Sequence, residues 1–357
     1  MIYLLRANHA NEFELQNYAP IATELQINVI TSQNPLTPVP MSTTKLWSPT
    51  DLPDLLMRRQ LLNRLIGGEQ WLIGLGNVIS KRYNDLNHCI MHTAETYTPY
   101  THQAVEMRKR GEITKLICTC WETIPHANEK FARLRKWKKE AYKYIDLFHT
   151  PTMRAKQALV AEGVDPQKVI VIPYGIDLSR FCPCLSGVSR KIRPLVLTVS
   201  RLEKEKGIED VIAVAQELPE YDFLIVGRGT YNPRGSNIKT TSISYSEIHK
   251  LYQKANLFFL PSITMPTWEE QYGMALVEAM ACGLPIVTTN SGAIPEVVGD
   301  AGVLIEEGNV DKMVKTIRNL LTSPDLITKY SKLSHVRATK FYDSKKIAEK
   351  LKNLYLE

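Results

Sequence analysis

Short apolar runs alternate with amphipathic stretches along the whole chain, and this alternation limits the fold more than any other feature. In the first half, the runs expected to form strands are Ile2–Leu5, Ile27–Thr31, Gln70–Leu75, His88–His92, Lys115–Thr119 and Val169–Ile172. In the second half, they are Leu195–Ser200, Asp222–Val226, Leu257–Leu260 and Pro285–Thr289. Strands that alternate with helical patterns build parallel sheets whose faces are covered by helices. The pattern therefore predicts an α/β chain with wound, Rossmann-like sheets in both halves.

The two series of strands are separated by a stretch rich in turn-forming residues. It reads Asp177-Leu-Ser-Arg-Phe-Cys-Pro-Cys-Leu-Ser-Gly, and the second series begins a few residues later. A chain of 357 residues is long enough for about two domains, each with its own core. We therefore predict a first domain over residues 1–185, a second over residues 186–335, and a helix over residues 336–357 that ends the chain. Wound sheets bind ligands most often at the carboxyl ends of their strands.

Composition and charge narrow the class of partner. Hydrophobic residues make up 44% of the chain and charged residues 23%, which is typical of a globular protein. The formal net charge of +7 favours an anionic partner: a nucleic acid, an anionic membrane or a phosphorylated small molecule. No apolar run reaches the roughly 18–20 residues of a membrane-spanning helix, and the N-terminal residues do not resemble a signal peptide. These features predict a soluble protein located in the cytoplasm.

The six cysteines favour free thiols over a zinc site. They include two Cys-x-Cys pairs, Cys118 with Cys120 and Cys182 with Cys184, but no Cys-x-x-Cys. A zinc site of the finger type needs two closely spaced clusters, ideally with histidines nearby. In an extended strand, Cys118 and Cys120 would point to the same face. We expect reduced cysteines, as is usual in the cytoplasm.

The most basic stretch, over residues 130–143, has two interpretations. It begins Lys130-Phe-Ala-Arg-Leu-Arg-Lys-Trp-Lys-Lys and has the period of an amphipathic helix. Runs of this kind usually form a solvent-exposed face. Alternatively, the helix docks on anionic lipid, and the protein is then peripheral on the inner face of the membrane. No nucleic-acid partner is expected, because few aromatic residues are interleaved with the basic ones.

Arg201 and Lys206 are candidates for binding a diphosphate. The chain has no Gly-x-x-x-x-Gly-Lys-Ser/Thr loop, no His-Glu-x-x-His and no Asp-x-Asp pair that would clamp a metal–diphosphate. A diphosphate would then be neutralised by cations and backbone amides. Arg201 and Lys206 lie five residues apart, between a predicted strand and a predicted helix, and both side chains suit phosphate. The alternative is a solvated loop in which basic and acidic side chains pair with each other.

The strongest pattern is Glu270-Gln-Tyr-Gly-Met-Ala-Leu-Val-Glu278, within residues 268–287. Gly273 precedes a helical run, so the amides of Gly273, Met274 and Ala275 would form an anion site at the positive end of the helix dipole. Glu278, about one turn further, could accept hydrogen bonds from the two hydroxyls of a ribose. Glu270 could accept hydrogen bonds from a transferred sugar. The alternatives are dipole compensation for Glu278 and a solvent-facing charge for Glu270.

Together these segments resemble glycosyltransferase family 4, the retaining sugar transferases of GT-B fold. Five blocks match in order: Val171-Ile-Pro-Tyr-Gly-Ile-Asp177, Val199-Ser-Arg-Leu-Glu-Lys-Glu-Lys-Gly207, Val226-Gly-Arg-Gly229 with its preceding strand, Leu260-Pro-Ser262 with the Glu270–Glu278 block, and Gly292-Ala-Ile-Pro-Glu-Val-Val298. The resemblance implies two Rossmann-like domains that face a central cleft. It also implies that the first domain is on the acceptor side, that the second binds a nucleotide sugar, and that the terminal helix crosses back to the first.

The resemblance implies roles for individual residues. Arg201 and Lys206 would hold the diphosphate and stabilise it as it leaves, Glu278 would bind the ribose, and Glu270 would contact the donor sugar. The other residues implied in donor binding are Gly229, Gly273, Met274 and Ile243, the last of which would pack on the nucleobase. Gln271 replaces the glycine that members carry after the first glutamate.

The first half departs further from the family. The segment Ala7-Asn-His-Ala-Asn11 has no glycine where members carry a glycine-rich loop. Residues 92–102 and 120–126 look like the family's active-site loops, but Trp121 and Glu122 stand where many members have a histidine. Glu122 is therefore the expected catalytic residue of this half, with Glu95 and His126 as further candidates. The alternative for all three is loop packing or capping.

The function that the resemblance implies is metal-independent transfer of a sugar, with retention, from a nucleotide-diphosphate sugar to an acceptor hydroxyl. The donor is a substrate, and we expect neither a cofactor nor a metal. The acceptor stays open between a glycan, a lipid-linked molecule and a small molecule. Two alternatives remain: a nucleotide-sugar epimerase or hydrolase on the same scaffold, and a non-catalytic anion-binding protein.

Overall fold

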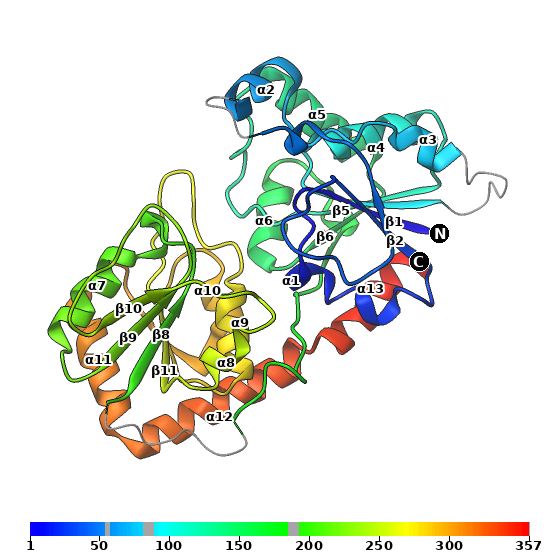
Figure 1. Cartoon of the computed structure of the whole chain (residues 1–357). Helices are drawn as coiled ribbons and strands as arrows, with labels where there is room; N and C mark the ends of the chain where they lie inside the picture. Colours follow the sequence, from blue (N-terminus) through cyan, green and yellow to red (C-terminus); the bar gives the residue numbers. More distant parts are fainter. Residues whose placement is uncertain (54–57, 81–88, 185–192, 357) are drawn as a thin grey trace. The chain divides into compact units, whose positions relative to one another are not determined.

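The chain folds into two compact units, each built on one parallel sheet (Figure 1). The computed structural model describes residues 1–53, 58–80, 89–184 and 193–356. Unit 1 comprises Met1–Tyr174 and Lys345–Glu357, and unit 2 comprises Gly175–Ser344. The prediction of wound α/β sheets in both halves is confirmed.

The sheet of unit 1 has seven strands in the order β3-β2-β1-β4-β5-β6-β7. They are β1 (Ile2–Ala7), β2 (Ile27–Thr31), β3 (Thr43–Lys45), β4 (Ile90–Ala94), β5 (Lys115–Thr119), β6 (Leu147–Thr150) and β7 (Val169–Val171). In the central strand β1, every residue is buried, and Ile2 lies between Ile27 and Ile90. The strand order reverses between β1 and β4, which is the place where wound sheets bind ligands.

Helices cover both faces of the unit 1 sheet. They are α1 (Glu12–Leu15), α2 (Arg58–Ile66), α3 (Leu75–Ser80), α4 (Pro99–Lys109), α5 (Ala132–Tyr144), α6 (Met153–Ala161) and α13 (Ser344–Leu356). Figure 1 shows α4 and α5 along one face and α13 along the other. Thr98 caps α4 by accepting a hydrogen bond from Thr101 N, and Pro99 suits the first helical position. The core beneath α4 and α5 is apolar and includes Leu5, Tyr100, Ala104, Leu116, Ala141 and Phe148.

A chain of hydrogen bonds crosses the other face of this sheet. His149 Nε2 donates to the carbonyl oxygen of Ile172 (2.7 Å), so its Nδ1 accepts from the Thr119 hydroxyl (3.0 Å). Thr119 Oγ1 in turn accepts from His92 Nε2 (2.8 Å), and His92 Nδ1 accepts from the Tyr355 hydroxyl of α13 (2.7 Å). With both histidines neutral, as burial favours, one carbonyl sets the direction of every bond in the chain. Burial lowers the pKa of both, that of His149 to about 4.

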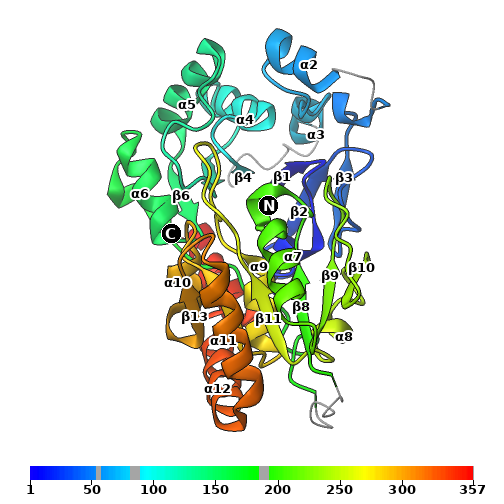
Figure 2. The ribbon, with the colours of Figure 1, turned by 90° about the vertical axis from the view of Figure 1, so that its left-hand side faces the viewer.

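The sheet of unit 2 has six strands in the order β10-β9-β8-β11-β12-β13. They are β8 (Leu195–Val199), β9 (Asp222–Val226), β10 (Ile238–Thr241), β11 (Leu257–Leu260), β12 (Ile286–Thr289) and β13 (Gly302–Ile305). The helices are α7 (Ile208–Glu217), α8 (His249–Tyr252), α9 (Met274–Ala281), α10 (Ile294–Val298), α11 (Val310–Thr322) and α12 (Pro324–Phe341). Figure 2 looks onto the face that α7 and α11 cover, where Val211, Val214, Met313 and Ile317 join one core with Phe223 and Phe259.

Several elements differ from the sequence prediction. Residues 70–75 form no strand: Ile73 makes a single bridge to Trp47, and α3 begins at Leu75. The strands β3, β6, β10 and β13 were not predicted; β3 and β10 contain few apolar residues, and all four pair with a neighbouring strand. Among the helices of the described ranges, none combines the length and the apolar character that crossing a bilayer requires.

The boundary between the units lies earlier than residue 185, after Tyr174. The stretch that follows packs within unit 2, because Ile176 bridges Asp343 and the Phe181 ring lies 6.0 Å from that of Tyr252. Residues 336–357 form the end of α12 and then α13, not a single helix. α13 packs in unit 1 through Tyr355 and through Lys115, whose ammonium donates to the Leu354 carbonyl (2.7 Å).

We predict that unit 1 loses stability in mild acid because of His149. The pKa of this residue falls from 6.5 to about 4 on folding, so below pH 6.5 only the unfolded chain takes up its proton. Between pH 6.5 and about pH 4, the contribution of His149 should lower the free energy of unfolding by about 3 kcal/mol. Below about pH 4, this contribution should not change further. Urea unfolding across the pH range measures the drop. His149→Gln should be less stable near neutrality but less acid-sensitive, whereas the exposed His126→Gln should keep the wild-type profile. Parallel profiles for His149→Gln and wild type would contradict the assignment.

Candidate active site

Lys206 and Glu270 form a mostly buried ion pair in unit 2. The Lys206 ammonium lies 2.6 Å from Glu270 Oε2 and 4.6 Å from the centre of the Trp268 ring. Glu270 Oε2 also accepts a hydrogen bond from the Ser262 hydroxyl at 2.9 Å. The two side chains are only 13% and 8% exposed, so their charges interact with little screening by water. The structure thus brings together two of the residues that the sequence singled out.

Close backbone contacts hold both partners in place. Gly207, which follows Lys206 and precedes α7, has a φ of 66°, and a Cβ there would lie 1.9 Å from the carbonyl oxygen of Pro261. The loop that carries Lys206 is therefore pressed against the loop that follows β11. Glu270 is fixed through its main chain, because Ala293 N donates to its carbonyl oxygen (2.8 Å).

The amino end of α9 lies beside this ion pair. Gly273 has a φ of 83°, and its Cβ position would be 3.7 Å from Glu270 Cγ. Because α9 begins at Met274, the amides of Met274 and Ala275 have no acceptor within the helix. A cation, a carboxylate and the positive end of a helix dipole therefore meet in one place, which suits the binding of a polar anion.

Glu278 belongs to a second, separate cluster. It is 4% exposed, and the Tyr252 hydroxyl donates to its Oε2 at 2.7 Å. Burial raises the pKa of Glu278 to about 7, although hydrogen bonds from Tyr252 and Tyr245 and the charge of Arg180 oppose the rise. Arg180 itself stacks over the Tyr245 ring at 4.5 Å. The alternative of dipole compensation for Glu278 stays open, whereas the solvent-facing charge considered for Glu270 is excluded, because Glu270 is 6% exposed.

Arg201, Gly229 and Ile243 are not part of either cluster in this structure. Arg201 is 60% exposed and pairs with Glu205 (2.8 Å), as in the alternative of a surface loop with internal ion pairs. A Cβ at Gly229 would lie 2.3 Å from the Leu202 carbonyl oxygen, so this glycine is needed for a close backbone approach. Ile243 is 41% exposed and opens onto a hollow of about 570 Å³ beside β9, β10 and α8. The implied donor-binding roles of these three residues stay predictions.

The sequence analysis missed the partners that surround the two clusters. Ser262, Trp268, Tyr252, Tyr245 and Arg180 complete them. Tyr252 is 26 residues from Glu278 along the chain, and Ser262 is eight residues from Glu270. No spacing rule connects such positions, because the contacts depend on how neighbouring strands bring their loops together.

In unit 1, Glu95 and Glu122 follow the neighbouring strands β4 and β5. Glu95 Oε1 accepts a hydrogen bond from Trp121 N (2.7 Å), and Glu122 Oε1 accepts from the Tyr97 hydroxyl (3.2 Å) and from Asn128 Nδ2 (2.9 Å). Burial and the charge of Glu122 hold the pKa of Glu95 well above its usual range. The catalytic role of Glu122 stays a prediction.

The remaining sequence candidates of unit 1 take part in ion pairs. His126 is exposed and pairs with Glu129 at 2.8 Å, and Lys138 pairs with Glu129 (3.2 Å) and Glu162 (2.7 Å). Lys138 is buried, so the basic stretch over residues 130–143 is not a uniformly solvated face. Cys118 and Cys120 are free thiols, and their Sγ atoms lie 3.7 Å apart. The two side chains therefore point to the same face, as predicted.

Two groups of His and Glu side chains in the described residues have the spacing of metal ligands. They are His102 with Glu106 and Glu140, and His126 with Glu129 and Glu162. Each group already holds a lysine ammonium, Lys109 in the first and Lys138 in the second. Ion pairing accounts for both groups without a metal.

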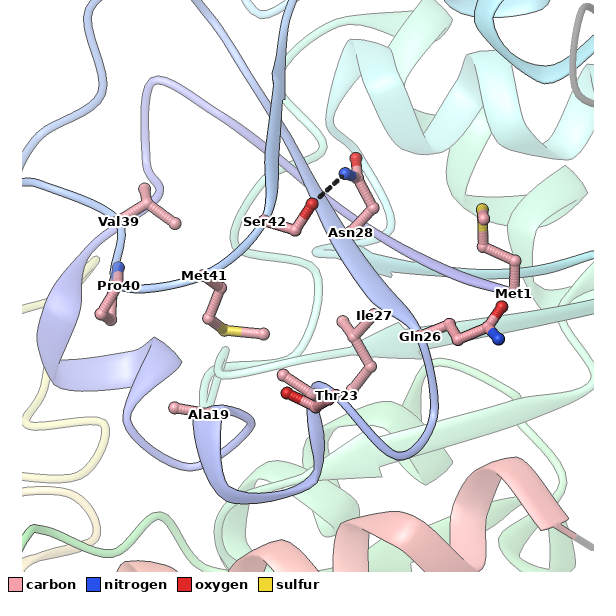
Figure 3. Close-up of a pocket in the computed structure, with 11 residues that line it drawn as sticks. Met1, Ala19, Thr23, Gln26, Ile27, Asn28, Val39, Pro40, Met41 and Ser42 are labelled. Carbon is pink, nitrogen blue, oxygen red and sulfur yellow. Dashed lines mark hydrogen bonds between the residues drawn. The ribbon is translucent and has the colours of Figure 1, made fainter.

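A further hollow, of about 740 Å³, lies at the amino ends of β1 and β2 (Figure 3). Asn28 Nδ2 donates to Ser42 Oγ across it at 2.9 Å, and Met1, Ile27 and Met41 line it. Wound sheets bind ligands at the opposite end of their strands. The hollow is therefore not part of the candidate active site.

We predict that the close packing at Gly207 is essential to the Lys206 loop. Gly207→Ala should lower the melting temperature far more than Gly308→Ala, because both glycines have a left-handed φ (66° and 73°) but only Gly207 meets a backbone atom. Gly308 belongs to the same unit and has nothing within 4 Å of its Cβ position. Thermal unfolding of the two variants measures the difference. Equal destabilisation would mean that the contact with Pro261 does not constrain the loop.

Comparison with known proteins places most of unit 2 in a known family. Residues 187–335 match the family model of glycosyl transferases group 1. The chain is 26% identical over 233 residues to the sulfoquinovosyl transferase SQD2 of Arabidopsis thaliana, a match that covers 59% of this chain and 44% of the relative. It is 29% identical over 178 residues to the GDP-mannose-dependent monoacylated alpha-(1-6)-phosphatidylinositol monomannoside mannosyltransferase of Corynebacterium glutamicum. This match covers 43% of this chain and 47% of the relative. The chain thus spans about half the length of the curated relatives it matches.

A solved structure resembles the whole chain. The structure of HepE from Anabaena in complex with UDP-glucose superposes with a TM-score of 0.75 over 99% of this chain and 98% of that one, at 16% identity. A likeness at this level of identity establishes the fold. The chain therefore has the GT-B fold, and its residues 187–335 match the family model of glycosyl transferases group 1.

Proposed function

We propose that this protein is a retaining glycosyltransferase that moves a sugar from a nucleotide-diphosphate sugar to an acceptor hydroxyl without a metal. The observation that carries the proposal is the Lys206–Glu270 pair beside the amino end of α9, within the group 1 domain. The structure of HepE that resembles this chain holds UDP-glucose, which supports a nucleotide-sugar donor.

Lys206 and the α9 amides would stabilise the leaving diphosphate. Negative charge builds on the diphosphate as the bond to the sugar breaks, and donors fixed in advance stabilise this charge without reorganising. In the structure, Lys206 is engaged by Glu270. An arriving diphosphate would share the ammonium, and Glu270 would turn its second oxygen to a sugar hydroxyl. Arg201 is exposed on the same loop and would exchange its Glu205 partner for phosphate.

Transfer would proceed without a protein nucleophile. The acceptor hydroxyl attacks the anomeric carbon on the face that the diphosphate leaves, and the leaving phosphate oxygen takes the hydroxyl proton. The bond from the anomeric carbon to the acceptor oxygen forms as the bond to the diphosphate oxygen breaks, and the proton passes from the acceptor to the diphosphate. The configuration of the sugar is retained. Glu122 would orient the acceptor, together with Tyr97, which donates to its carboxylate.

Glu278 would recognise the ribose of the donor. Its carboxylate accepts hydrogen bonds from Tyr252, at Oε2, and from Tyr245, and ribose hydroxyls would donate to its remaining acceptor positions. Ile243 and the hollow that it lines would take the nucleobase, and Gly229 would let the backbone approach the donor. These assignments rest on the family resemblance.

We further propose that the acceptor is carried by a lipid and that the protein works in the cytoplasm at the membrane surface. The relative from Corynebacterium glutamicum, by its name, acts on a phosphatidylinositol monomannoside. The free thiols of Cys118 and Cys120 are in keeping with a reducing compartment. The exposed lysines and arginines of α5 supply the positive charge that an anionic lipid surface attracts.

The proposal predicts that Lys206→Ala and Glu278→Gln each lower turnover by about 10²-fold or more while the fold survives. A thermal-shift screen with UDP, GDP and ADP first identifies the nucleotide, since a ligand of the folded state raises the melting temperature. Release of that nucleotide from its sugar conjugates, with and without acceptor, then measures turnover. Lys312→Ala, on the exposed surface of α11, is the matched control. Near-normal turnover in both site variants would refute the assignment, and release that never depends on acceptor would indicate the hydrolase or epimerase.

Metal independence gives a separate prediction. Turnover should be unchanged after prolonged treatment with EDTA, because fixed cationic and amide groups replace the metal that other transferases use to neutralise a diphosphate. The measurement is the same nucleotide-release assay before and after the chelator and after addition of Mg²⁺ or Mn²⁺. Loss of activity that either ion restores would overturn this part of the proposal.

A further inference from the structure

Helix α2 of unit 1 exposes apolar side chains that a helix on a globular protein normally buries. None of its residues is buried, and Leu61 and Leu65 are each 57% exposed. The two leucines are four residues apart, so they lie on one face of the helix. The helix sequence, Arg58-Arg-Gln-Leu-Leu-Asn-Arg-Leu-Ile, contains three arginines and no acidic residue. Such a combination is characteristic of helices that lie in a membrane interface.

The body of unit 1 holds α2 in this orientation. Arg133 of α5 donates to the Leu65 carbonyl oxygen at 2.6 Å, and the Trp71 indole donates to the Ile66 carbonyl oxygen at 3.2 Å. At Gly67 a Cβ would lie 2.4 Å from the Trp137 ring, so the chain leaves the helix pressed against α5. These contacts use the end of the helix and its backbone, which leaves the leucine side chains pointing away from the core.

Further exposed apolar side chains lie in the chain segments before and after α2. Trp47 and Ile73 are 46% and 54% exposed, and they are joined by a hydrogen bond from Ile73 N to the Trp47 carbonyl oxygen (2.9 Å). Ile66, at the end of α2, is 37% exposed and contacts Trp71, which lies two residues before Ile73. We call Trp47, Leu61, Leu65, Ile66 and Ile73 the docking face.

Basic side chains border the docking face. Arg59 and Arg64 on α2 and Arg133 and Lys136 on α5 are all exposed. A hollow of about 780 Å³ between these helices is lined both by Leu65 and Ile66 and by Arg133 and Lys136, so apolar and cationic groups open onto the same space.

The acidic side chains in this neighbourhood are paired with basic ones, but Glu106 and Glu140 share one ammonium, so one negative charge remains against the four exposed cations. Glu69 pairs with Arg58 (3.2 Å), and Glu106 and Glu140 both pair with Lys109 (2.6 and 3.2 Å). The net character of the region is therefore apolar and cationic.

We propose that the docking face rests on a bilayer that contains anionic phospholipid. The leucines and isoleucines would enter the boundary between headgroups and acyl chains, Trp47 would lie at headgroup level, and the four cations would meet lipid phosphates. A nucleic acid would satisfy the cations but would leave the leucines in water, so the apolar half of the face favours lipid. The sequence pointed to residues 130–143 for membrane contact; the structure assigns the apolar anchor to α2 and leaves α5 a supporting electrostatic role. This inference stands whether or not the protein transfers a sugar.

Vesicle flotation with the whole protein tests the proposal. Wild-type protein should float with vesicles of phosphatidylcholine and about one third phosphatidylglycerol at low salt, and should stay behind with phosphatidylcholine alone. Leu61→Gln with Leu65→Gln should lower the partition coefficient at least about tenfold. The matched control is Val336→Gln with Phe341→Gln on α12, whose side chains are 52% and 40% exposed. Arg59→Gln with Arg64→Gln should weaken binding and flatten its salt dependence, unlike Lys312→Gln with Lys315→Gln.

Each outcome decides for or against the docking face. The proposal is overturned if wild-type protein does not float with anionic vesicles, or if the leucine variant floats as well as wild type with an unchanged melting temperature. It is also overturned if a labelled RNA oligonucleotide binds more tightly than the vesicles and the leucine variant binds it normally. Thermal shift with the cognate nucleotide should be equal in all variants. If no nucleotide raises the melting temperature but the protein floats normally with anionic vesicles, the proposed function is refuted and this inference stands.

Discussion

Lys206 can occupy a mostly buried position only because Glu270 neutralises it. Removing an ammonium from water is costly, and the carboxylate at 2.6 Å, itself supported by Ser262, offsets that cost. The arrangement depends on three loops at the carboxyl ends of neighbouring parallel strands, and on a glycine after Lys206 that lets two of these loops touch. An incoming anion could therefore replace Glu270 as the partner of Lys206, and no new charge would have to be created in the buried site.

The two units use buried polar groups in opposite ways. In unit 1, His92 and His149 are kept neutral, and the bonds through Thr119 run in one direction from Tyr355 to the Ile172 carbonyl. That network serves to fix α13 on the sheet. In unit 2, the charged pair of Lys206 and Glu270 lies beside helix amides that have no acceptor within α9. In unit 1, polar groups whose hydrogen bonds are all made within the network stabilise the fold. In unit 2, the helix amides that lack an acceptor within α9 belong to the candidate site.

Surface charge by itself was a poor guide to surface function. The basic stretch over residues 130–143 stands out in the sequence, yet the structure buries Lys138 in two ion pairs and packs Trp137 against the end of α2. The less basic α2 carries the exposed leucines. A docking surface needs apolar and cationic groups on the same face, and only the placement of α2 beside α5 shows where both occur.

The sequence alone determined the class of fold, because alternating apolar and amphipathic runs can be satisfied only by wound parallel sheets. It also located Lys206, Glu270, Gly273 and Glu278, since these lie in short local patterns at strand–helix junctions. It assigned no role to Tyr252, Ser262 or Trp268, and it did not reveal the contact between Tyr252 and Glu278. The Arg201–Glu205 pair, by contrast, has a four-residue spacing and matches the alternative of a loop with internal ion pairs. Only the tertiary structure decided that Lys206 meets Glu270 while Glu278 lies apart with Tyr252. The physical reason is that local patterns specify where a strand ends and a helix begins, whereas the pairing of side chains depends on strand order and loop packing, which no single segment encodes.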